Sequence, residues 1–297
     1  MSRRGWFLFA VMSLVWGVSY LFIKVAVQSV PVPVVVFVRC AAAALVLLPF
    51  VARGGWADAA RAVRAHWRWL IVFAALEMIG PWWLLTSAER ELTSSMAGLI
   101  VAAVPIVGIV VARLLGDRER LGVLRWCGLL IGLIGVGVLA APALQGGSGW
   151  ALAQMALVVL GYATAPLITV RQLGEVPGLV LATASLAFAG LVYTPAAVLA
   201  WPSGWPSLPV FGALAGLAVV STALAFVAFF ALIREVGTAR AMVFTYVNPA
   251  VAVVAGVLVL AEPLTPSIVA GFVLIMAGSL LAAGVRRRAG RQALSPA

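Results

Sequence analysis

Long apolar runs separated by short polar stretches dominate this chain. Each run holds about 20 mainly apolar residues, the length that an α-helix needs to cross the hydrocarbon core of a bilayer. The runs lie at about residues 6–26, 33–51, 69–87, 94–112, 124–141, 150–168, 177–199, 209–231, 240–260 and 265–285. They are too long and alternate too weakly for the strands of a membrane barrel. The pattern therefore predicts an all-α integral membrane protein with ten transmembrane helices.

The first apolar run and the connection between the second and third runs lead to two further expectations. The run that follows Arg3 and Arg4 has full membrane length, whereas the apolar part of a signal peptide is shorter. We therefore expect it to be retained as the first helix. The connection between the second and third runs, 52–68, is the longest polar stretch and is rich in Arg, Ala and Trp. It is expected to be a loop.

A repeat organises the chain. Residues 90–105 read RELTSSMAGLIVAAVP, and residues 234–249 read REVGTARAMVFTYVNP, an offset of 144. Gly17 recurs at the same offset as Gly161. In each copy a charged turn precedes a small or hydroxyl residue that can cap a helix, and a proline follows about ten residues later. The repeat divides the chain into residues 1–142 and 143–288, with a C-terminal tail, 289–297, that we expect to be disordered.

Each repeat carries five predicted helices, so the second must enter the membrane in the opposite direction from the first. Such inverted-topology repeats are typical of secondary transporters. The repeats also differ: Tyr246 and Asn248 stand where the first copy has Ala102 and Val104. We expect the shared residues to form the scaffold and these unmatched residues to contribute specificity.

The basic residues predict the orientation. Of the 20 Lys and Arg residues, all except Lys24, Arg39 and Arg90 fall at the N-terminus, the C-terminus or in the even-numbered connections. Cytoplasmic segments of membrane proteins are enriched in these residues. Both termini are therefore predicted to be cytoplasmic, with the chain passing several times through the cell inner membrane.

Composition supports a membrane protein and excludes several other classes. The 297 residues are 64% hydrophobic and only 10% charged, far from the average of a soluble domain. The net charge of +11 comes from basic residues beside apolar runs, so nucleic-acid binding is not expected. Cys40 and Cys127 lie inside apolar runs, which argues against a disulfide framework.

Motifs for cofactor, metal or enzyme chemistry are absent from the sequence. It has no GxxxxGK[ST] phosphate loop, no Gly-x-Ser-x-Gly elbow and a single histidine, His66. We therefore expect no cofactor, no metal and no catalytic residues. The expected partners are a small-molecule substrate and the lipid bilayer.

Several motifs match a known family. Trp16-Gly17 with Ser19 and Lys24 is followed by Arg39 and Pro49, and the two halves end in ARLLGDRE at 112–119 and VLAEPLTP at 259–266. The chain resembles the drug/metabolite transporter superfamily and, within it, the ten-helix EamA-type carriers, over about residues 5–284. The second half departs from the pattern because Leu160 stands in place of the tryptophan. The resemblance implies a transporter fold and says little about the substrate, although the buried Trp and Tyr look most like those of aromatic amino-acid exporters.

Ionisable residues within the predicted spans are costly in a bilayer and are therefore candidate functional groups. Glu77 lies near the middle of the third span, where it could carry a proton, meet a substrate ammonium or simply hydrogen-bond a neighbouring helix. Lys24 could extend to the outer interface, pair in a gate or meet a substrate carboxylate. Arg39 could pair with a carbonyl, a headgroup or a carboxylate. Lys24, Arg39 and Glu77 are the candidate gating or coupling residues.

Aromatic and polar side chains deep in the spans predict a substrate cavity near the midplane. Interfacial belts explain tryptophans at the span ends, but not these deeper residues, for which pocket lining and simple packing are both open. The candidate substrate-binding residues are Trp16, Tyr20, Glu77, Met78, Trp82, Trp83, Ser95, Tyr162, Thr222, Tyr246 and Asn248. The prolines within spans, which are expected to kink their helices, are Pro81, Pro105, Pro166 and Pro249.

Small residues mark the fifth and tenth spans. Gly128, Gly132, Gly135, Gly271 and Gly278 allow close helix packing, either within one chain or between two copies. The protein is therefore expected to be a monomer or a homodimer.

Together these features predict a secondary transporter that exports amino acids, with an aromatic or bulky hydrophobic preference, by alternating access. One alternative keeps the fold and changes the cargo to nucleosides, purines, sugar conjugates or cationic compounds. Another is a membrane protein that does not transport, such as an intramembrane enzyme or a receptor. An enzyme would need paired acids or histidines at membrane depth, and Glu77 has no such partner in the sequence.

Overall fold

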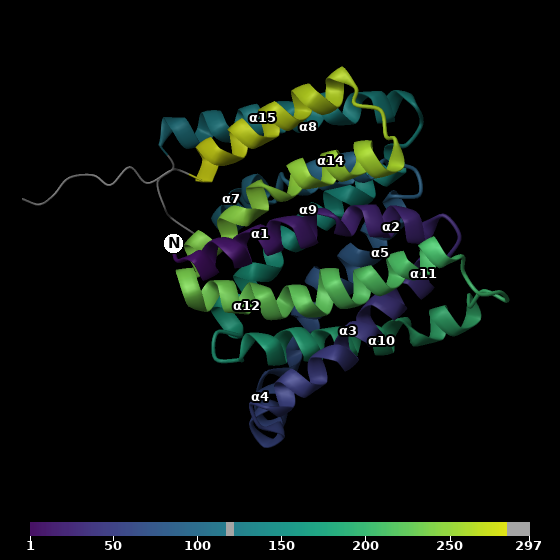
Figure 1. The fold of residues 1–297 in the computed structure, drawn as a ribbon. Helices are drawn as coiled ribbons and strands as arrows, with labels where there is room; N and C mark the ends of the chain where they lie inside the picture. Colours follow the sequence, from purple (N-terminus) through teal and green to yellow (C-terminus); the bar gives the residue numbers. More distant parts are fainter. Residues whose placement is uncertain (117–121, 284–297) are drawn as a thin grey trace, which may run out of the picture.

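The protein was analysed as a computed structural model, which describes residues 1–116 and 122–283 (Figure 1). All regular elements in these residues are helices. The predicted tail, 289–297, lies outside the described residues. So do Arg118 and Arg120 and the last three residues of the ARLLGDRE motif.

The first half of the chain forms the following helices, where η marks a π or 3₁₀ segment: α1 (Arg3–Gly17), α2 (Ser19–Val27), α3 (Val32–Ala52), α4 (Trp56–Ala74), η1 (Ala75–Ile79), α5 (Gly80–Ala88), α6 (Ser94–Val101), α7 (Val104–Leu114) and α8 (Val123–Gln145). The second half forms α9 (Gly149–Gln172), α10 (Gly178–Leu199), α11 (Leu208–Ala215), η2 (Gly216–Leu224), α12 (Ala225–Val236), α13 (Thr238–Ala241), η3 (Met242–Tyr246), α14 (Asn248–Leu260) and α15 (Pro266–Ala283).

Eight helical runs among the described residues are long and apolar enough to cross a membrane, and two shorter apolar helices follow, Asn248–Leu260 and Pro266–Ala282. Each of them coincides with one of the apolar runs of the sequence. Several are composite, because α1 continues into α2, and η1 and η2 each join two α-helices. The predicted all-helical fold is confirmed for the described residues.

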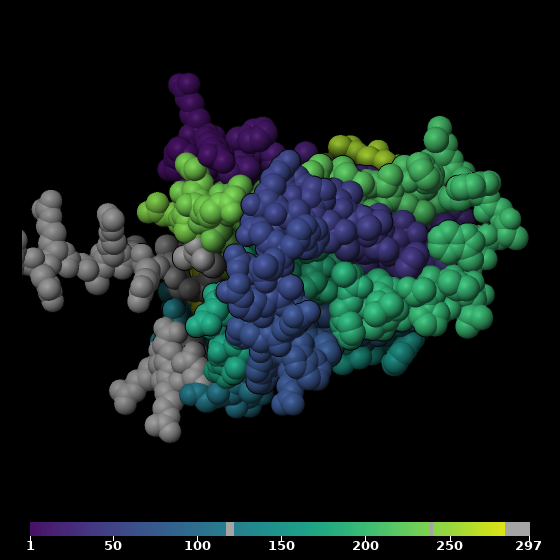
Figure 2. Space-filling model, turned by 90° about the horizontal axis from the view of Figure 1, so that it is seen from below, coloured from purple at the N-terminus to yellow at the C-terminus, as the bar shows by residue number. Residues whose placement is uncertain are grey.

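The expected loop at 52–68 is wrong, because α4 already begins at Trp56. This segment is rich in alanine, a strong helix former, and its charged and apolar residues divide into two faces. An exposed ion pair of 2.9 Å joins Asp58 and Arg61 on the polar side. Only His66 departs from helical backbone angles within α4. Figure 2 shows the blue residues of α4 at the surface of the face seen from below.

The helix interruptions follow the sequence repeat. The π segment Ala75–Ile79, moved by 144 residues, falls inside the π segment Gly216–Leu224. In the same way α7 begins at Val104 and α14 at Asn248, each with a proline as its next residue. A proline lacks the N–H of an interior helical residue and is tolerated in the first turn.

The prolines expected to kink their helices do not behave alike. Pro81, Pro105 and Pro249 stand in the first turn of a new α-helix, at an interruption of the span. Pro166 lies inside α9, which runs on as one α-helix from Gly149 to Gln172. The helix is therefore not interrupted at Pro166, and a kink there stays a prediction.

Glycines bring α8 and α15 into backbone contact, side by side in Figure 1. A Cβ atom at Gly278 would lie 2.5 Å from Cα of Gly132, and one at Gly128 would lie 2.8 Å from O of Gly278. A Cβ at Gly271 would approach O of Gly135 at 3.3 Å. Residues nearer the N-terminus of α8 thus contact residues nearer the C-terminus of α15, so the two helices are antiparallel. These glycines serve close packing within one chain.

The same contacts are reciprocal between the repeats. At an offset of 143 residues, one less than that of the repeat at 90–105, Gly128 corresponds to Gly271 and Gly135 to Gly278. Gly128 meets Gly278, and Gly135 meets Gly271. The equivalents of the two residues in one contact therefore form the other contact, as expected when two units are related by a two-fold axis. Helices α3 and α10, which occupy equivalent places in the two halves, also pack on each other.

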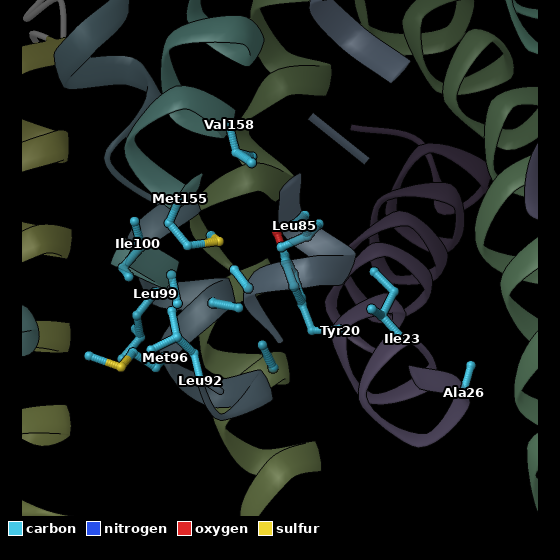
Figure 3. Close-up of a cluster of buried hydrophobic side chains, with 14 of the residues drawn as sticks. Tyr20, Ile23, Ala26, Leu85, Leu92, Met96, Leu99, Ile100, Met155 and Val158 are labelled. Atoms are coloured by element: carbon cyan, nitrogen blue, oxygen red, sulfur yellow. The ribbon is translucent and has the colours of Figure 1, made fainter. Parts of the chain in front are cut away.

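The buried core lies between these two helix pairs. Its largest cluster includes Tyr20 of α2, Leu85 of α5, Met96 of α6 and Met155 of α9. Figure 3 shows Tyr20 reaching from α2 toward Leu85. A second cluster gathers Cys40, Met78, Trp82 and Tyr193, among others, from α3, η1, α5 and α10. The polar residues described next lie along the boundary of these clusters.

Candidate functional site

Arg39 of α3 lies at the centre of the candidate site. It is only 7% exposed, and its Nε donates to Oγ1 of Thr222 at 3.0 Å. The guanidinium carbon lies 3.6 Å from the centre of the Trp82 ring, a cation–π stacking arrangement. No other hydrogen bond of this guanidinium is formed within the part of the chain that the structure describes. Its terminal nitrogens therefore keep donors for a ligand.

The π segment η2 positions Thr222. Its hydroxyl donates to O of Leu217, five residues earlier, at 2.7 Å, and accepts the bond from Arg39. π segments within α-helices are rare and are often found at functional sites. Thr222 was among the predicted site residues, and the structure places it against Arg39.

The equivalent π segment, η1, carries Glu77 and Met78. The N–H of Gly80 donates to O of Ala75, the i to i−5 spacing of a π turn, and Pro81 follows without an N–H of its own. Glu77 is partly exposed and interacts electrostatically with Arg39 and Tyr162. A carboxyl deep in a span with accessible surface can meet a ligand. Met78 is fully buried beside Trp82 in the same cluster.

Tyr162 of α9 and Tyr20 of α2 complete this group. Both interact electrostatically with Arg39, and Tyr162 also with Glu77 and Trp82. Gly161 allows α9 to approach this closely, because a Cβ there would lie 2.5 Å from O of Leu76. We call Arg39, Glu77, Trp82, Tyr162 and Thr222 the central cluster.

The ring of Trp83 has a different partner from the ring of Trp82. Its ring stacks on Tyr193 of α10 with centroids 5.7 Å apart and planes at 6°, and the Tyr193 hydroxyl donates to O of Ile79. Consecutive residues of a helix point about 100° apart, so Trp82 meets Arg39 whereas Trp83 meets Tyr193. The sequence did not single out Tyr193, which supports the π segment through Ile79.

Trp16 and Tyr20 are four residues apart, and the structure assigns them to separate clusters. Trp16 packs against Phe226, Phe229 and Phe244, with centroid distances of 5.2 to 6.2 Å. Tyr20 packs instead against Gly98 of α6. The division falls where α1 ends at Gly17 and α2 begins at Ser19. Trp16 therefore lies in an aromatic cluster outside the central cluster.

Tyr246 and Asn248 also lie near that aromatic cluster. Tyr246 is the last residue of the 3₁₀ segment η3 and is partly exposed. With its amide nitrogen assigned to the side that faces two carbonyls, Asn248 donates to O of Phe244 and to O of Ser13, each at 3.1 Å. The Asn248 side chain thus ties α14 to α1.

Lys24 of α2 bonds to backbone carbonyls of the turn that follows α5. Its ammonium donates to O of Glu89 at 2.6 Å and to O of Leu92 at 2.8 Å. Both carbonyls belong to the turn between α5 and α6. A lysine at the C-terminal end of a helix also meets the negative end of the helix dipole. Lys24 therefore secures this turn.

A carboxylate that the sequence did not single out secures the start of α6. Glu262, in the turn between α14 and α15, accepts from N and Oγ of Ser94 at 2.7 and 2.9 Å, and from N and Oγ of Ser95 at 3.0 and 2.5 Å. Thr93 accepts from N of Met96 as the predicted helix cap. Gly256 allows this approach, since a Cβ there would lie 2.3 Å from Oε2 of Glu262. Ser95 is thereby engaged by Glu262, away from the central cluster.

Glu89 was also missed by the sequence reading. It directly follows α5, is 0% exposed, and neither carboxylate oxygen has a hydrogen-bond partner among the described residues. Burial raises the pKa of the Glu89 carboxyl well above its usual value, whereas nearby Lys24 acts in the opposite direction. The residue was overlooked because it stands in a charged stretch, 89–91, that reads as a solvated turn.

The structure therefore brings together five predicted residues in the central cluster, with Tyr20 and Met78 beside it. It places Trp16, Ser95, Tyr246 and Asn248 elsewhere, whereas Trp83 packs against the cluster that holds Trp82 and Met78. Within the described residues no group of three His, Cys, Asp or Glu side chains could hold a metal ion. The central cluster offers a guanidinium, a carboxyl and aromatic surface, which can bind an organic ion by charge and stacking.

Known proteins resemble this chain along most of its length. The EamA-like transporter family matches residues 3–141 and again residues 149–284. The inner membrane transporter YedA of Escherichia coli K12, described as uncharacterized, is 29% identical over 245 residues, which cover 82% of this chain and 78% of that protein. An uncharacterized transporter of Archaeoglobus fulgidus is 24% identical over 96% of this chain and 100% of its own.

A solved crystal structure shares the fold, with a TM-score of 0.70 at 19% identity, covering 97% of this chain and 100% of that one. The family match covers nearly all of the described chain, and the resemblance to the drug/metabolite transporter superfamily is confirmed. The chain belongs to the EamA-like transporter family and is a multi-pass membrane transporter.

Proposed function

We propose that this transporter exports amino acids with aromatic or bulky hydrophobic side chains across the cell inner membrane. The observation that carries the proposal is the Arg39 guanidinium, held over Trp82 and bonded to Thr222, with Glu77 on the adjoining π segment. An amino acid has a carboxylate, an ammonium and a side chain, and this cluster offers one complementary group for each.

Each part of the substrate has a chemical counterpart in the central cluster. The planar guanidinium of Arg39 can pair with a carboxylate through two parallel hydrogen bonds. The Glu77 carboxylate can accept from the ammonium. Trp82 and Tyr162 supply aromatic surface for the side chain, and Met78 packs behind Trp82. Arg39 and Glu77 then act as binding residues for a zwitterion.

We further propose that the chain crosses the membrane ten times, as two inverted halves, 1–142 and 143–288, with both termini cytoplasmic. The reciprocal glycine contacts of α8 and α15 support the inverted relation. So do the equivalent positions of the two π segments and the two separate family matches. The placement of Lys and Arg supports the orientation.

Alternating access would arise from bending where the helices are already interrupted. The π segments η1 and η2 and the proline-led starts of α7 and α14 lie in spans that pack on α9 or α1. Few backbone bonds need to change at such points. Tyr246, partly exposed beside one of these points, is our proposed specificity residue. Asn248 would affect specificity indirectly, because its bonds to O of Phe244 and O of Ser13 hold the start of α14 against α1.

The proposal is tested by counterflow in proteoliposomes. Vesicles loaded with phenylalanine are diluted into labelled phenylalanine, and other compounds compete from outside. We expect tryptophan, phenylalanine and methionine to compete, and glycine and glutamate to fail. Competition only by nucleosides, purines or cationic drugs would overturn the amino-acid assignment while keeping a transporter. No flux of any of these compounds would favour a membrane protein that does not transport.

A further inference from the structure

Glu89 is a fully buried acidic residue at the start of the turn between α5 and α6, outside the central cluster. We call this end of the helix bundle, with turns 89–93 and 261–265, the Glu89 end. The carboxyl is fully enclosed, and both of its oxygens lack a partner among the described residues. A carboxylate enclosed without hydrogen bonds is strongly unfavourable compared with the neutral acid.

The donors closest in sequence are already engaged. The N–H groups of Glu89, Arg90, Glu91 and Leu92 donate to carbonyls of residues 85, 87 and 88. The Lys24 ammonium donates to O of Glu89 and to O of Leu92.

The following residues offer nothing further. Both the N–H and the hydroxyl of Ser94, and those of Ser95, donate to Glu262. The donors at the Glu89 end therefore bond to backbone carbonyls and to the Glu262 carboxylate. None of them bonds to the Glu89 carboxyl.

The charges that face Glu89 come from three elements. Lys24 of α2 and Arg39 of α3 favour its ionised form, and Glu262, in the turn after α14, disfavours it. Tyr20 of α2 also interacts with it electrostatically. Burial outweighs the two cations, so the pKa of the Glu89 carboxyl is raised. The ammonium of Lys24 would repel a metal cation from this place, which leaves a proton as the fitting ligand.

We propose that Glu89 is a proton-binding site that makes closure of the Glu89 end depend on pH. In the closed arrangement seen here the carboxyl holds one proton. When α6 moves away from Glu262 and water reaches the turn, the O–H bond breaks, the proton passes to water and the carboxylate is hydrated. The reverse happens on closure. No other reactant takes part.

The sign follows from linkage. The closed end binds one proton more than the open end between the ordinary pKa of a glutamate and the raised pKa of Glu89. Low pH therefore favours closure and rising pH favours opening. Within that window each pH unit lowers the ratio of closed to open forms by up to about tenfold.

Infrared titration tests the protonation directly on the whole protein in liposomes. The carbonyl stretch of a neutral carboxyl is followed from pH 5 to pH 9. We expect the wild type to keep a band at neutral pH that Glu89→Gln lacks, that Glu91→Gln retains and that Glu89→Asp shifts to a different titration. Glu91 is exposed two residues away and is the matched control. Identical titrations of the wild type and Glu89→Gln would overturn the proposal.

Closure is measured by the distance between spin labels at Arg90→Cys and Leu264→Cys, both exposed positions of the two turns, with Cys40→Ala and Cys127→Ser. We expect the short-distance population to fall as pH rises in the wild type, and to stay high at every pH in Glu89→Gln, which imitates the neutral acid. The proposal would be contradicted if the distance changed with sodium and not with pH. It would also be contradicted if the distance changed with pH equally in the wild type and in Glu89→Gln. Neither measurement requires a substrate, so the proton-site proposal can be tested independently of the amino-acid proposal.

Discussion

The guanidinium of Arg39 lies 3.6 Å from the centre of the Trp82 ring and donates from Nε to Thr222. This relationship fixes the orientation of a cation inside a helical membrane bundle. It joins three spans, since Arg39 belongs to α3, Trp82 to α5 and Thr222 to η2. A cation that is held in this way presents its remaining N–H groups in a defined direction, which is what recognition of a carboxylate requires.

Replacing Arg39 with lysine keeps the charge and removes the planar donor. We expect Arg39→Lys to weaken substrate binding by about tenfold or more, because the bidentate geometry and the stacking on Trp82 are both lost. The apparent affinity in counterflow measures this. The control is Arg53→Lys, which alters another arginine near an aromatic ring, 5.2 Å from Phe50. Equal losses in both variants would count against a specific role for Arg39.

Removing the Glu262 carboxylate should unfasten the start of α6. Hydrogen bonds to charged groups contribute about 1.5–3 kcal/mol each, so Glu262→Ala is expected to destabilise the fold by at least about 2 kcal/mol. Thermal unfolding of the purified protein in detergent measures the loss. Glu175→Gln, at an exposed turn between α9 and α10, should leave the transition unchanged. If both variants melt alike, the four bonds to Ser94 and Ser95 do not hold α6.

Adding volume at Gly278 should separate α8 from α15. A Cβ there would lie 2.3 Å from N of Gly132, so Gly278→Val must displace backbone, at a cost of about 1–3 kcal/mol or more. We expect less folded protein and a lower melting temperature. Gly137→Ala is the control, because a Cβ at Gly137 would meet nothing within 4 Å. Tolerance of Gly278→Val would show that these backbones do not touch.

The buried Glu89 carboxyl predicts a pH dependence of stability. Its pKa is raised in the folded protein, so its contribution is fully present below the ordinary pKa of a glutamate and is lost as pH rises through the folded pKa. The wild type should therefore lose stability between pH 5 and pH 9 relative to Glu89→Gln. Parallel thermal unfolding of both proteins at each pH gives the difference. A constant difference across that range would disprove the raised pKa.

The helices were predictable because long apolar runs leave one structural solution in a bilayer. The repeat predicted which interruptions would correspond, and Pro105 and Pro249 both begin a helix. The extension of α4 back to Trp56 was missed because its arginines were read as topology signals of a loop. Alanine-rich segments with charges on one face form helices all the same.

The candidate site was only partly predictable, because contacts between distant residues are not written in local patterns. Glu262 binds serines 167 and 168 residues earlier, and Glu89 is fully buried although it stands in a charged stretch. Neither the contact of Glu262 with the serines nor the burial of Glu89 can be found from the spacing of residues in the sequence. Trp82 and Trp83 looked equivalent in the sequence, but a helix turns them toward different neighbours, Arg39 and Tyr193. Arg39 and Glu77 were found because charge inside an apolar span is conspicuous.

The central claim is that Arg39 meets the carboxylate of an amino acid and Glu77 its ammonium. The most direct measurement is equilibrium binding of phenylalanine, of its amide, which lacks the carboxylate, and of phenylpropionate, which lacks the ammonium. The wild type should bind phenylalanine at least about tenfold more tightly than either analogue. Arg39→Lys should lose the preference over the amide, and Glu77→Gln the preference over phenylpropionate. Equal binding of all three compounds to the wild type would contradict the account.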